Sequence, residues 1–220
     1  MGVKPVACCA FIVCGDGRID IARLLADRCS DDLLIAADSG ANCLLAAGFM
    51  PDIVVGDMDS VQDDVLERLQ GQSQLLAHPA DKDFTDAELA LRLAVERGAT
   101  EVALLNDLGG LFDHALGVVA LLFVARSLGV KAHIRNDNQR VWLVDGHWRL
   151  SVGIGAIVSL LPWSDEALVL ATEGLRWPLH NENLLRSATR GISNEATHPT
   201  IEVAVASGDL LAVVTLGEKA

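Results

Sequence analysis

The first 136 residues alternate short apolar runs with segments in which apolar residues recur three and four positions apart. The runs have the length of buried strands, and the periodic segments have the spacing of amphipathic helices. Strands that alternate with helices form parallel sheets, since each helix carries the chain back across the sheet. The pattern therefore predicts an α/β domain with a doubly wound, mostly parallel sheet. We expect strands at 7–13, 33–37, 53–55, 75–77, 102–105 and 131–134, and helices at 20–28, 40–47, 63–70, 85–97 and 113–128.

The pattern changes near residue 137. Short apolar runs follow one another, separated by Gly, Pro, Asp and Asn, and no long helical segment interrupts them. Such spacing is typical of an antiparallel all-β domain, either a sandwich or a barrel. We therefore predict two domains, an α/β domain over 1–136 and an all-β domain over 137–220.

Charge and cysteine content restrict the partners and the compartment. The chain has 30 acidic and 17 basic residues, and its net charge of −13 argues against nucleic acid as a partner. No apolar run approaches the roughly 20 residues of a membrane span, so no membrane partner is expected. All five cysteines lie in the first 43 residues without Cys-x-x-Cys spacing. Free thiols in a reducing cytoplasm are favoured over a disulfide framework or a zinc site.

Four polar clusters follow predicted strands or open predicted helices. In a doubly wound sheet, ligands bind beyond the carboxyl ends of the strands, so the four clusters predict a single site. The most informative is the pair Asp57 and Asp59, which comes directly after an apolar run. The clusters are Asp38-Ser39-Gly40-Ala41-Asn42, Gly56-Asp57-Met58-Asp59-Ser60, Asp81-Lys82-Asp83-Phe84-Thr85-Asp86, and Leu108-Gly109-Gly110 with Asp113-His114.

The acids of the second and third clusters indicate a cation. If both loops lie at one sheet edge, mutual repulsion of their carboxylates raises the free energy of the site unless a cation neutralises them. Mg²⁺ bound to a polyphosphate fits, because it prefers carboxylate, phosphate and water oxygens. A simpler interpretation explains part of the third cluster, since Thr85 and Glu88 have the spacing of a helix capping box. No P-loop motif is present.

The remaining two clusters have ordinary interpretations beside the functional one. Backbone amides at the start of helix 40–47 can face a phosphate or a ribose, but Asp38 to Asn42 can equally be a simple helix start. Gly109 and Gly110 allow a close backbone approach to a ligand. His114 at a helix start is more often a surface or packing residue than a catalytic base.

Together these motifs resemble the thiamine pyrophosphokinase family. The four clusters occur in the order and approximate spacing of that family, and the likeness continues through Gly174-Leu175-Arg176-Trp177-Pro178-Leu179 and Gly191-Ile192-Ser193-Asn194-Glu195. The resemblance implies an α/β ATP-binding domain, a C-terminal β-sandwich and a homodimer. It also implies transfer of the pyrophosphoryl group of ATP to the hydroxyl of thiamine, which yields thiamine diphosphate and AMP.

The resemblance also implies roles for single residues. Asp57, Asp59 and Asp86 would be catalytic and hold Mg²⁺, with Asp83 or Asp81 in support. Trp177, Ser193 and Asn194 would bind thiamine, and a Trp ring face suits a cationic heterocycle. The ATP-binding residues would be Asp38, Ser39, Asn42, Lys82, Asp83, Thr85, Gly109, Gly110 and Asp113.

Some points stay open at this stage. Either Asp59 or Asp86 can accept the proton of the alcohol. Leu111 stands where family members usually carry an arginine, and Gly117 stands near a common asparagine; Lys82, Arg18 or an arginine of a partner chain are candidates to replace the missing cation. The alternative functions are a pyrophosphokinase acting on another heterocyclic alcohol, such as a hydroxymethylpterin, and a non-catalytic thiamine or nucleotide sensor.

Overall fold

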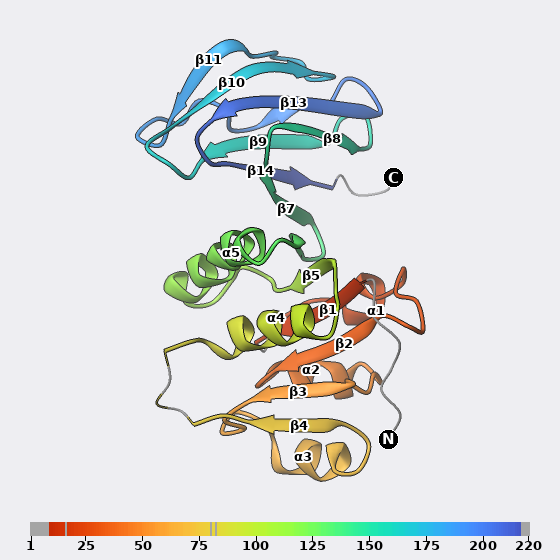
Figure 1. Ribbon diagram of the computed structural model, residues 1–220. Helices are drawn as coiled ribbons and strands as arrows, with labels where there is room; N and C mark the ends of the chain where they lie inside the picture. Colours follow the sequence, from red (N-terminus) through yellow and green to blue (C-terminus); the bar gives the residue numbers. More distant parts are fainter. Residues whose placement is uncertain (1–8, 16, 80, 82, 217–220) are drawn as a thin grey trace. The chain divides into compact units, whose positions relative to one another are not determined.

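The computed structural model describes residues 9–15, 17–79, 81 and 83–216 (Figure 1). The chain divides into two compact units, the first ending at Asp137 and the second beginning at Asn138. Two sequence predictions fall outside the described residues, namely the start of the first strand at 7–8 and the ATP-binding role of Lys82.

The first unit is built on a parallel sheet with the strand order β6-β5-β1-β2-β3-β4. The chain moves outward from β1 to β4 and then returns to the other side of β1, so the order reverses at β1. The carboxyl end of β1 is therefore where a ligand is expected. The strands are β1 (Cys9–Cys14), β2 (Leu33–Ala37), β3 (Ile53–Gly56), β4 (Gln74–Ala77), β5 (Glu101–Leu105) and β6 (Lys131–Arg135).

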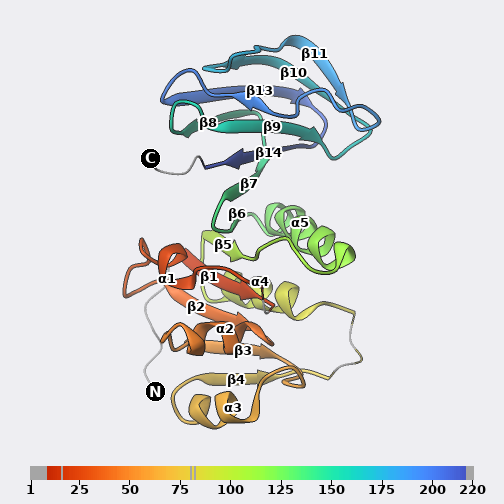
Figure 2. The same cartoon turned by 180° about the vertical axis from the view of Figure 1, so that it is seen from behind.

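Helices cover both faces of this sheet, which confirms the predicted doubly wound α/β fold. One apolar core joins α1, α2 and α3 to the sheet, while α4 packs on β1, β2 and β3 and contacts α5. Helix α4 lies in front of the sheet in Figure 1, and α2 lies in front when the view is turned in Figure 2. The helices are α1 (Ile21–Leu24), α2 (Gly40–Ala46), α3 (Asp63–Leu69), α4 (Asp86–Glu96) and α5 (Phe112–Ser127).

Helix α1 is shorter than the predicted helix over 20–28. It begins as expected, because the Asp20 side chain accepts a hydrogen bond from the backbone N–H of Arg23 at 3.1 Å. After Leu25 the chain tightens, and the N–H of Arg28 donates to the carbonyl of Leu25 at 3.0 Å. The Arg28 side chain then donates to the carbonyl of Asp32 at 2.8 Å. This contact draws the chain toward β2 and ends the helix early.

The predicted capping box at α4 forms only in part. The Thr85 hydroxyl accepts a hydrogen bond from the N–H of Glu88 at 3.2 Å, as the motif requires. The Glu88 carboxylate does not reach back, because it binds the Arg92 guanidinium one turn later at 3.0 and 2.7 Å. A charged partner on the same helix face outcompetes the neutral backbone N–H.

Replacement of Thr85 by alanine should lower the free energy of unfolding by about 1 kcal/mol, because one N–H at the start of α4 loses its acceptor. Urea denaturation followed by far-ultraviolet circular dichroism measures this change without ATP. Thr85→Ser keeps the hydroxyl and is the matched control. Equal stability of Thr85→Ala and Thr85→Ser would show that the cap does not contribute.

The second unit is a β-sandwich, as predicted. One antiparallel sheet has the order β11-β10-β13-β8, and the other strands pair as β12-β9-β14-β7. Their inner faces share one core, in which Leu160 and Ala212 from one side meet Val169 and Val203 from the other. The strands are β7 (Gln139–Val144), β8 (His147–Ser151), β9 (Ile157–Pro162), β10 (Glu166–Glu173), β11 (His180–Leu185), β12 (Asn194–Glu195), β13 (Thr200–Ser207) and β14 (Leu210–Thr215).

Two strands of this unit were not predicted. Strand β11 carries His180, Asn181, Glu182 and Asn183, and among its six residues only Leu184 is buried. Strand β12 has two residues. Neither presents an apolar run, so the sequence pattern did not indicate them. Among the described residues, no helix is both long and apolar enough to cross a membrane.

Candidate active site

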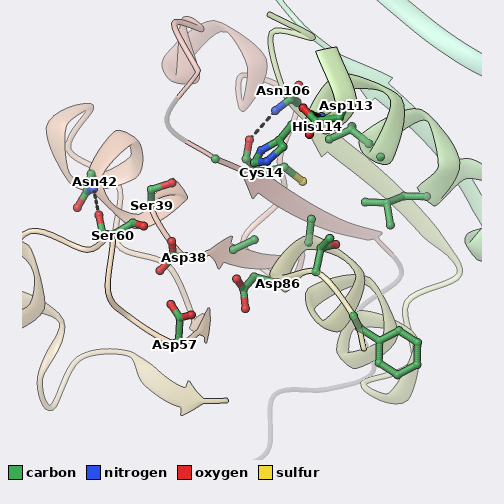
Figure 3. Close-up of a pocket in the computed structure, with 18 of the residues that line it drawn as sticks. Cys14, Asp38, Ser39, Asn42, Asp57, Ser60, Asp86, Asn106, Asp113 and His114 are labelled. Atoms are coloured by element: carbon green, nitrogen blue, oxygen red, sulfur yellow. Dashed lines mark hydrogen bonds between the residues drawn. The ribbon is translucent and has the colours of Figure 1, made fainter. Parts of the chain in front are cut away.

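Three carboxylates gather at the carboxyl ends of the strands in the first unit (Figure 3). Asp38 follows β2, Asp57 follows β3, and Asp86 is the first residue of α4. One oxygen from each lies within 4.8 Å of the others, and all three side chains are half-buried. Because α4 packs on β1, β2 and β3, its first turn reaches the edge where these strands end.

The backbone at this edge is arranged to bring Asp38 and the end of β3 together. Parallel pairing sets Ala37 opposite Val55, so the residues that follow both strands become neighbours. The N–H of Asp38 donates to the carbonyl of Val55 at 2.8 Å, and Asp38 has a φ of 46°. Gly56 permits the approach, since a Cβ there would lie 3.0 Å from the Asp38 Cβ. Such strained conformations concentrate at functional sites.

Without a cation, the negative charges of the three carboxylates are not compensated. Burial raises the pKa of Asp38, and the neighbouring Asp86 and Asp57 carboxylates raise it further, while hydrogen bonds with Ser60 and Ser39 act in the opposite direction. The Asp38 Oδ1 atom is buried and has no hydrogen-bond partner among the described residues. Oxygen ligands with like charge and an unused buried acceptor fit a hard divalent cation such as Mg²⁺.

Asp59, which the sequence groups with Asp57 and Asp86, lies outside this cluster, and Asp38 takes its place. Strand β3 ends at Gly56, and Met58 has a φ of 68°, so the chain turns instead of continuing as a strand. The exposed Asp59 carboxylate accepts a hydrogen bond from the Ser60 hydroxyl at 2.9 Å. The turn therefore separates two acids that an extended chain would place on one side.

The cluster lies in a cavity of about 880 Å³ in the first unit. Most of the nucleotide-binding residues predicted from the sequence line it, whereas Gly109 and Gly110 do not, although they belong to a neighbouring loop. Cys14 also lines the cavity, but burial raises its pKa to about 12, so it is not a nucleophile. The predicted residues that line the cavity are Asp38, Ser39, Asn42, Asp57, Asp83, Thr85, Asp86 and Asp113.

Asn42 uses both ends of its amide to hold the wall of the cavity. Its Nδ2 atom donates to the carbonyl of Ser60 at 2.9 Å, and its Oδ1 atom accepts from the N–H of Gln62 at 3.0 Å. These bonds tie α2 to the turn after β3. The side chain therefore fixes the position of the loop that carries Asp57.

Sequence reasoning missed Asn106 and Asp107, which follow β5. Asn106 lines the cavity, and its side chain donates to the carbonyl of Cys14 at 2.6 Å. The Asp107 carboxylate accepts from the N–H groups of Gly109 at 2.9 Å and Arg18 at 3.2 Å. The two residues thus fasten the loop after β1 to the loop after β5. An Asn-Asp pair directly after a predicted strand was the available signal.

A second cavity, of about 390 Å³, lies within the β-sandwich unit. All three predicted thiamine-binding residues, Trp177, Ser193 and Asn194, line it. The Asn194 side chain accepts from the N–H of Trp177 at 3.1 Å and donates to its carbonyl at 2.7 Å. Trp177 is 56% exposed, so this residue does not belong to the core. Ser193 has a φ of 59°. Among the other lining residues, Leu179, Gly191 and Ile192 belong to the two quoted motifs but had no assigned role, whereas sequence reasoning did not single out Leu160, Thr189 and Arg190.

Two family models match most of the chain. Residues 26–134 match the family model described as thiamin pyrophosphokinase, catalytic domain, and residues 147–210 match the model described as thiamin pyrophosphokinase, vitamin B1 binding domain. The chain belongs to the thiamine pyrophosphokinase family. The catalytic-domain match contains Asp38, Asp57 and Asp86 and most of the other residues that line the first cavity. The vitamin B1 binding match contains all the residues that line the second cavity, Trp177 among them.

Three members of the family match this chain over most of their own length. Thiamine pyrophosphokinase of Bacillus subtilis is 28% identical over 92% of this chain and 96% of its own. Thiamine pyrophosphokinase 1 of rice, Oryza sativa subsp. japonica, is 26% identical over 94% and 87%. The crystal structure of the Geobacillus thermodenitrificans thiamin pyrophosphokinase superimposes with a TM-score of 0.82 at 27% identity, covering 96% of this chain and 99% of that one.

Proposed function

We propose that this protein is a thiamine pyrophosphokinase, which transfers the pyrophosphoryl group of ATP to thiamine. The observation that carries the proposal is the cluster of Asp38, Asp57 and Asp86, with carboxylate oxygens within 4.8 Å of one another in a cavity of the first unit. Because the chain belongs to the thiamine pyrophosphokinase family, we assign ATP and thiamine as the substrates. The relatives compared above are all named thiamine pyrophosphokinases, which does not favour the pterin enzyme or the sensor.

The proposed reaction forms one phosphorus–oxygen bond and breaks another. The hydroxyethyl oxygen of thiamine bonds to the β phosphorus of ATP. The bond from that phosphorus to the oxygen bridging the α and β phosphates breaks, and AMP leaves with this oxygen. The alcohol proton passes to a carboxylate. Of the two candidates, Asp86 lines the cavity whereas Asp59 does not, so the geometry favours Asp86.

Mg²⁺ is the proposed cofactor, held by Asp57 and Asp86 together with Asp38. When bound, the ion neutralises polyphosphate charge and polarises the phosphoryl oxygens. Without it, the three carboxylates would repel the same polyphosphate. Asp59, on the same turn as Asp57, stays a predicted ligand of the metal or of its water shell.

The remaining assignments divide between the two cavities. We assign Ser39, Asn42, Asp83, Thr85 and Asp113 to ATP, with Gly109, Gly110 and Lys82 kept as predictions. Trp177, Ser193 and Asn194 are assigned to thiamine. Two observations support this division. Three carboxylates line the first cavity, which suits a metal–polyphosphate complex, and the aromatic residue Trp177 lines the second, which suits a cationic heterocycle.

A homodimer in a reducing cytoplasm completes the proposal. Trp177 and Ile192, which line the second cavity, are 56% and 51% exposed in the single chain, and a second copy would cover such apolar surface. Among the described residues, Cys14 and Cys29 are free thiols, which favours a reducing compartment. Size-exclusion chromatography with light scattering tests the dimer, and a monomer at assay concentration would contradict it.

An assay of the purified protein tests the proposed reaction. The protein is incubated with ATP, Mg²⁺ and thiamine, and AMP and thiamine diphosphate are separated by chromatography, with a hydroxymethylpterin as a parallel acceptor. We expect AMP and thiamine diphosphate in equal amounts and no transfer to the pterin. Transfer to the pterin alone, or nucleotide binding without turnover, would replace the proposed function with one of the two alternatives.

Loss of the Trp177 ring should weaken thiamine binding selectively. We expect Trp177→Ala to raise the KM for thiamine about 10-fold and to leave the KM for ATP unchanged, because the ring faces the cationic thiazolium. Trp177→Phe keeps an aromatic face and should show a smaller rise. Steady-state kinetics with each substrate varied in turn measures both constants. An equal rise in both KM values would indicate a structural role for Trp177.

A further inference from the structure

The charges that line the first cavity are unbalanced for a site that is to hold ATP. Among the described lining residues, five are acids and one, His114, is a base. ATP brings several negative charges of its own, and one divalent ion does not neutralise both sets. A second group that can donate to phosphate oxygens is therefore needed. The five acids are Asp38, Asp57, Asp83, Asp86 and Asp113.

His114 is placed to be that group. It lies in the first turn of α5, a helix of 16 residues whose N-terminal end carries partial positive charge. Its backbone N–H donates to the Asp113 carboxylate at 3.0 Å, whereas its ring makes no hydrogen bond or ion pair with any described residue. The side chain is exposed at the cavity wall. A packing role would require the ring to be buried, so of the two ordinary interpretations only a surface position is left, and this surface is the wall of the cavity.

His114 lies apart from the acid cluster within the cavity. Figure 3 shows it beside Cys14 and Asp113, on the α5 side of the cavity, whereas Asp57 lies at the end of β3. If a metal at the acids holds one part of the polyphosphate chain, another of its phosphates can therefore lie near His114. An imidazole N–H donates to a phosphate oxygen in either protonation state of the ring.

We propose that His114 binds the α-phosphate of the nucleotide and stabilises it as AMP leaves. This inference rests on the proposed function, because it takes the first cavity as the nucleotide site. When the bond to the β phosphorus breaks, the electron pair stays on the bridging oxygen, and the α-phosphate gains one negative charge. The metal cluster serves the transferred pyrophosphoryl group, so the only described base that lines the cavity is left for the departing phosphate.

Calorimetric titration of AMP and of adenosine, at one fixed Mg²⁺ concentration, tests the inference without turnover. The two ligands differ only in the α-phosphate. We expect His114→Ala to weaken AMP binding about 10-fold or more and to leave adenosine binding unchanged, since a hydrogen bond to the charged phosphate is lost. His114→Gln retains an N–H donor and should recover part of the affinity. His180→Ala, which removes an exposed histidine of β11, is the control.

The outcomes separate this inference from the proposed function. Unchanged AMP affinity in His114→Ala, or equal losses for AMP and adenosine, would overturn the role of His114. ATP is titrated in parallel, and loss of ATP affinity with unchanged AMP affinity would place His114 on the β- or γ-phosphate and would also overturn the inference. A selective loss of AMP affinity in a protein that makes no thiamine diphosphate would uphold the inference and refute the proposed function. Absence of AMP binding to the unaltered protein would refute both.

Discussion

Asp57→Asn should lower the rate of thiamine diphosphate formation at least about 100-fold. A metal ion at a phosphoryl group supplies several kcal/mol of charge stabilisation, and each 1.36 kcal/mol corresponds to about a tenfold change in rate. Asparagine has the shape of aspartate and keeps an oxygen to accept the N–H of Asp59, which now lies 3.3 Å from Asp57 Oδ1. The substitution therefore removes the negative charge and preserves the turn.

Two measurements accompany the rate. Circular dichroism and melting curves should show that Asp57→Asn stays folded, and Mg²⁺ with ATP should raise its melting temperature less than it raises that of the unaltered protein. Asp63→Asn removes an exposed acid from the first turn of α3, outside the cavity, and should retain activity. Full activity of Asp57→Asn would remove the metal assignment.

The fold was predictable because its signals are local. Strands β2, β3 and β5 are short apolar runs buried in the parallel sheet, and such strands are nearly continuous in hydrophobic character. Helix α4 begins at the predicted Thr85 cap. The polar strand β11 escaped prediction, because only one of its six residues is buried and no periodicity of two results.

The composition of the carboxylate cluster was less predictable, because it depends on strand pairing. Asp38 and Asp57 are 19 residues apart, and only the register that sets Ala37 opposite Val55 brings them together. Asp59 is two residues from Asp57, yet the chain turns at Met58, which has a positive φ. The Asp59 side chain is therefore directed toward Ser60. Sequence spacing indicates a shared side only while the chain stays extended. The sequence therefore predicted the location of the site and grouped Asp57 with Asp86, but it did not show that Asp38 joins them in place of Asp59.

The second large effect concerns Asp38, where activity and stability should change in opposite directions. We expect Asp38→Asn to lower the rate of product formation at least about 10-fold, because one oxygen of the proposed metal site loses its charge. The same variant should melt at a higher temperature than the unaltered protein when both are free of metal at neutral pH. Burial and the nearby carboxylates raise the pKa of Asp38, so its ionised form is unfavourable in the folded state. Asparagine also tolerates the φ of 46° at this position.

The pH dependence of this difference follows from the direction of the shift. Because the pKa of Asp38 is higher in the folded than in the unfolded state, the folded protein binds the proton more tightly. The carboxyl group therefore imposes no cost below its unfolded pKa, about 3.9. The cost develops as the pH rises through the folded pKa. Melting curves without metal should thus show a gap between Asp38→Asn and the unaltered protein at neutral pH that closes in acid.

Added Mg²⁺ should reverse the order of the two proteins. The ion binds the folded, ionised form of the unaltered protein and stabilises it by mass action, whereas Asp38→Asn gains less.

A conservative change in a less crowded acid, Asp113→Asn, is a matched comparison, because Asp113 lines the same cavity but is not one of the three clustered carboxylates. It should show no gain in stability without metal. If Asp38→Asn is less stable than the unaltered protein at neutral pH without metal, the repulsion within the cluster is offset by contacts of the Asp38 carboxylate, and the electrostatic argument for a cation fails. If Asp38→Asn is the more stable protein without metal and the less stable one with Mg²⁺, the acids repel one another until a cation binds, as a metal site requires.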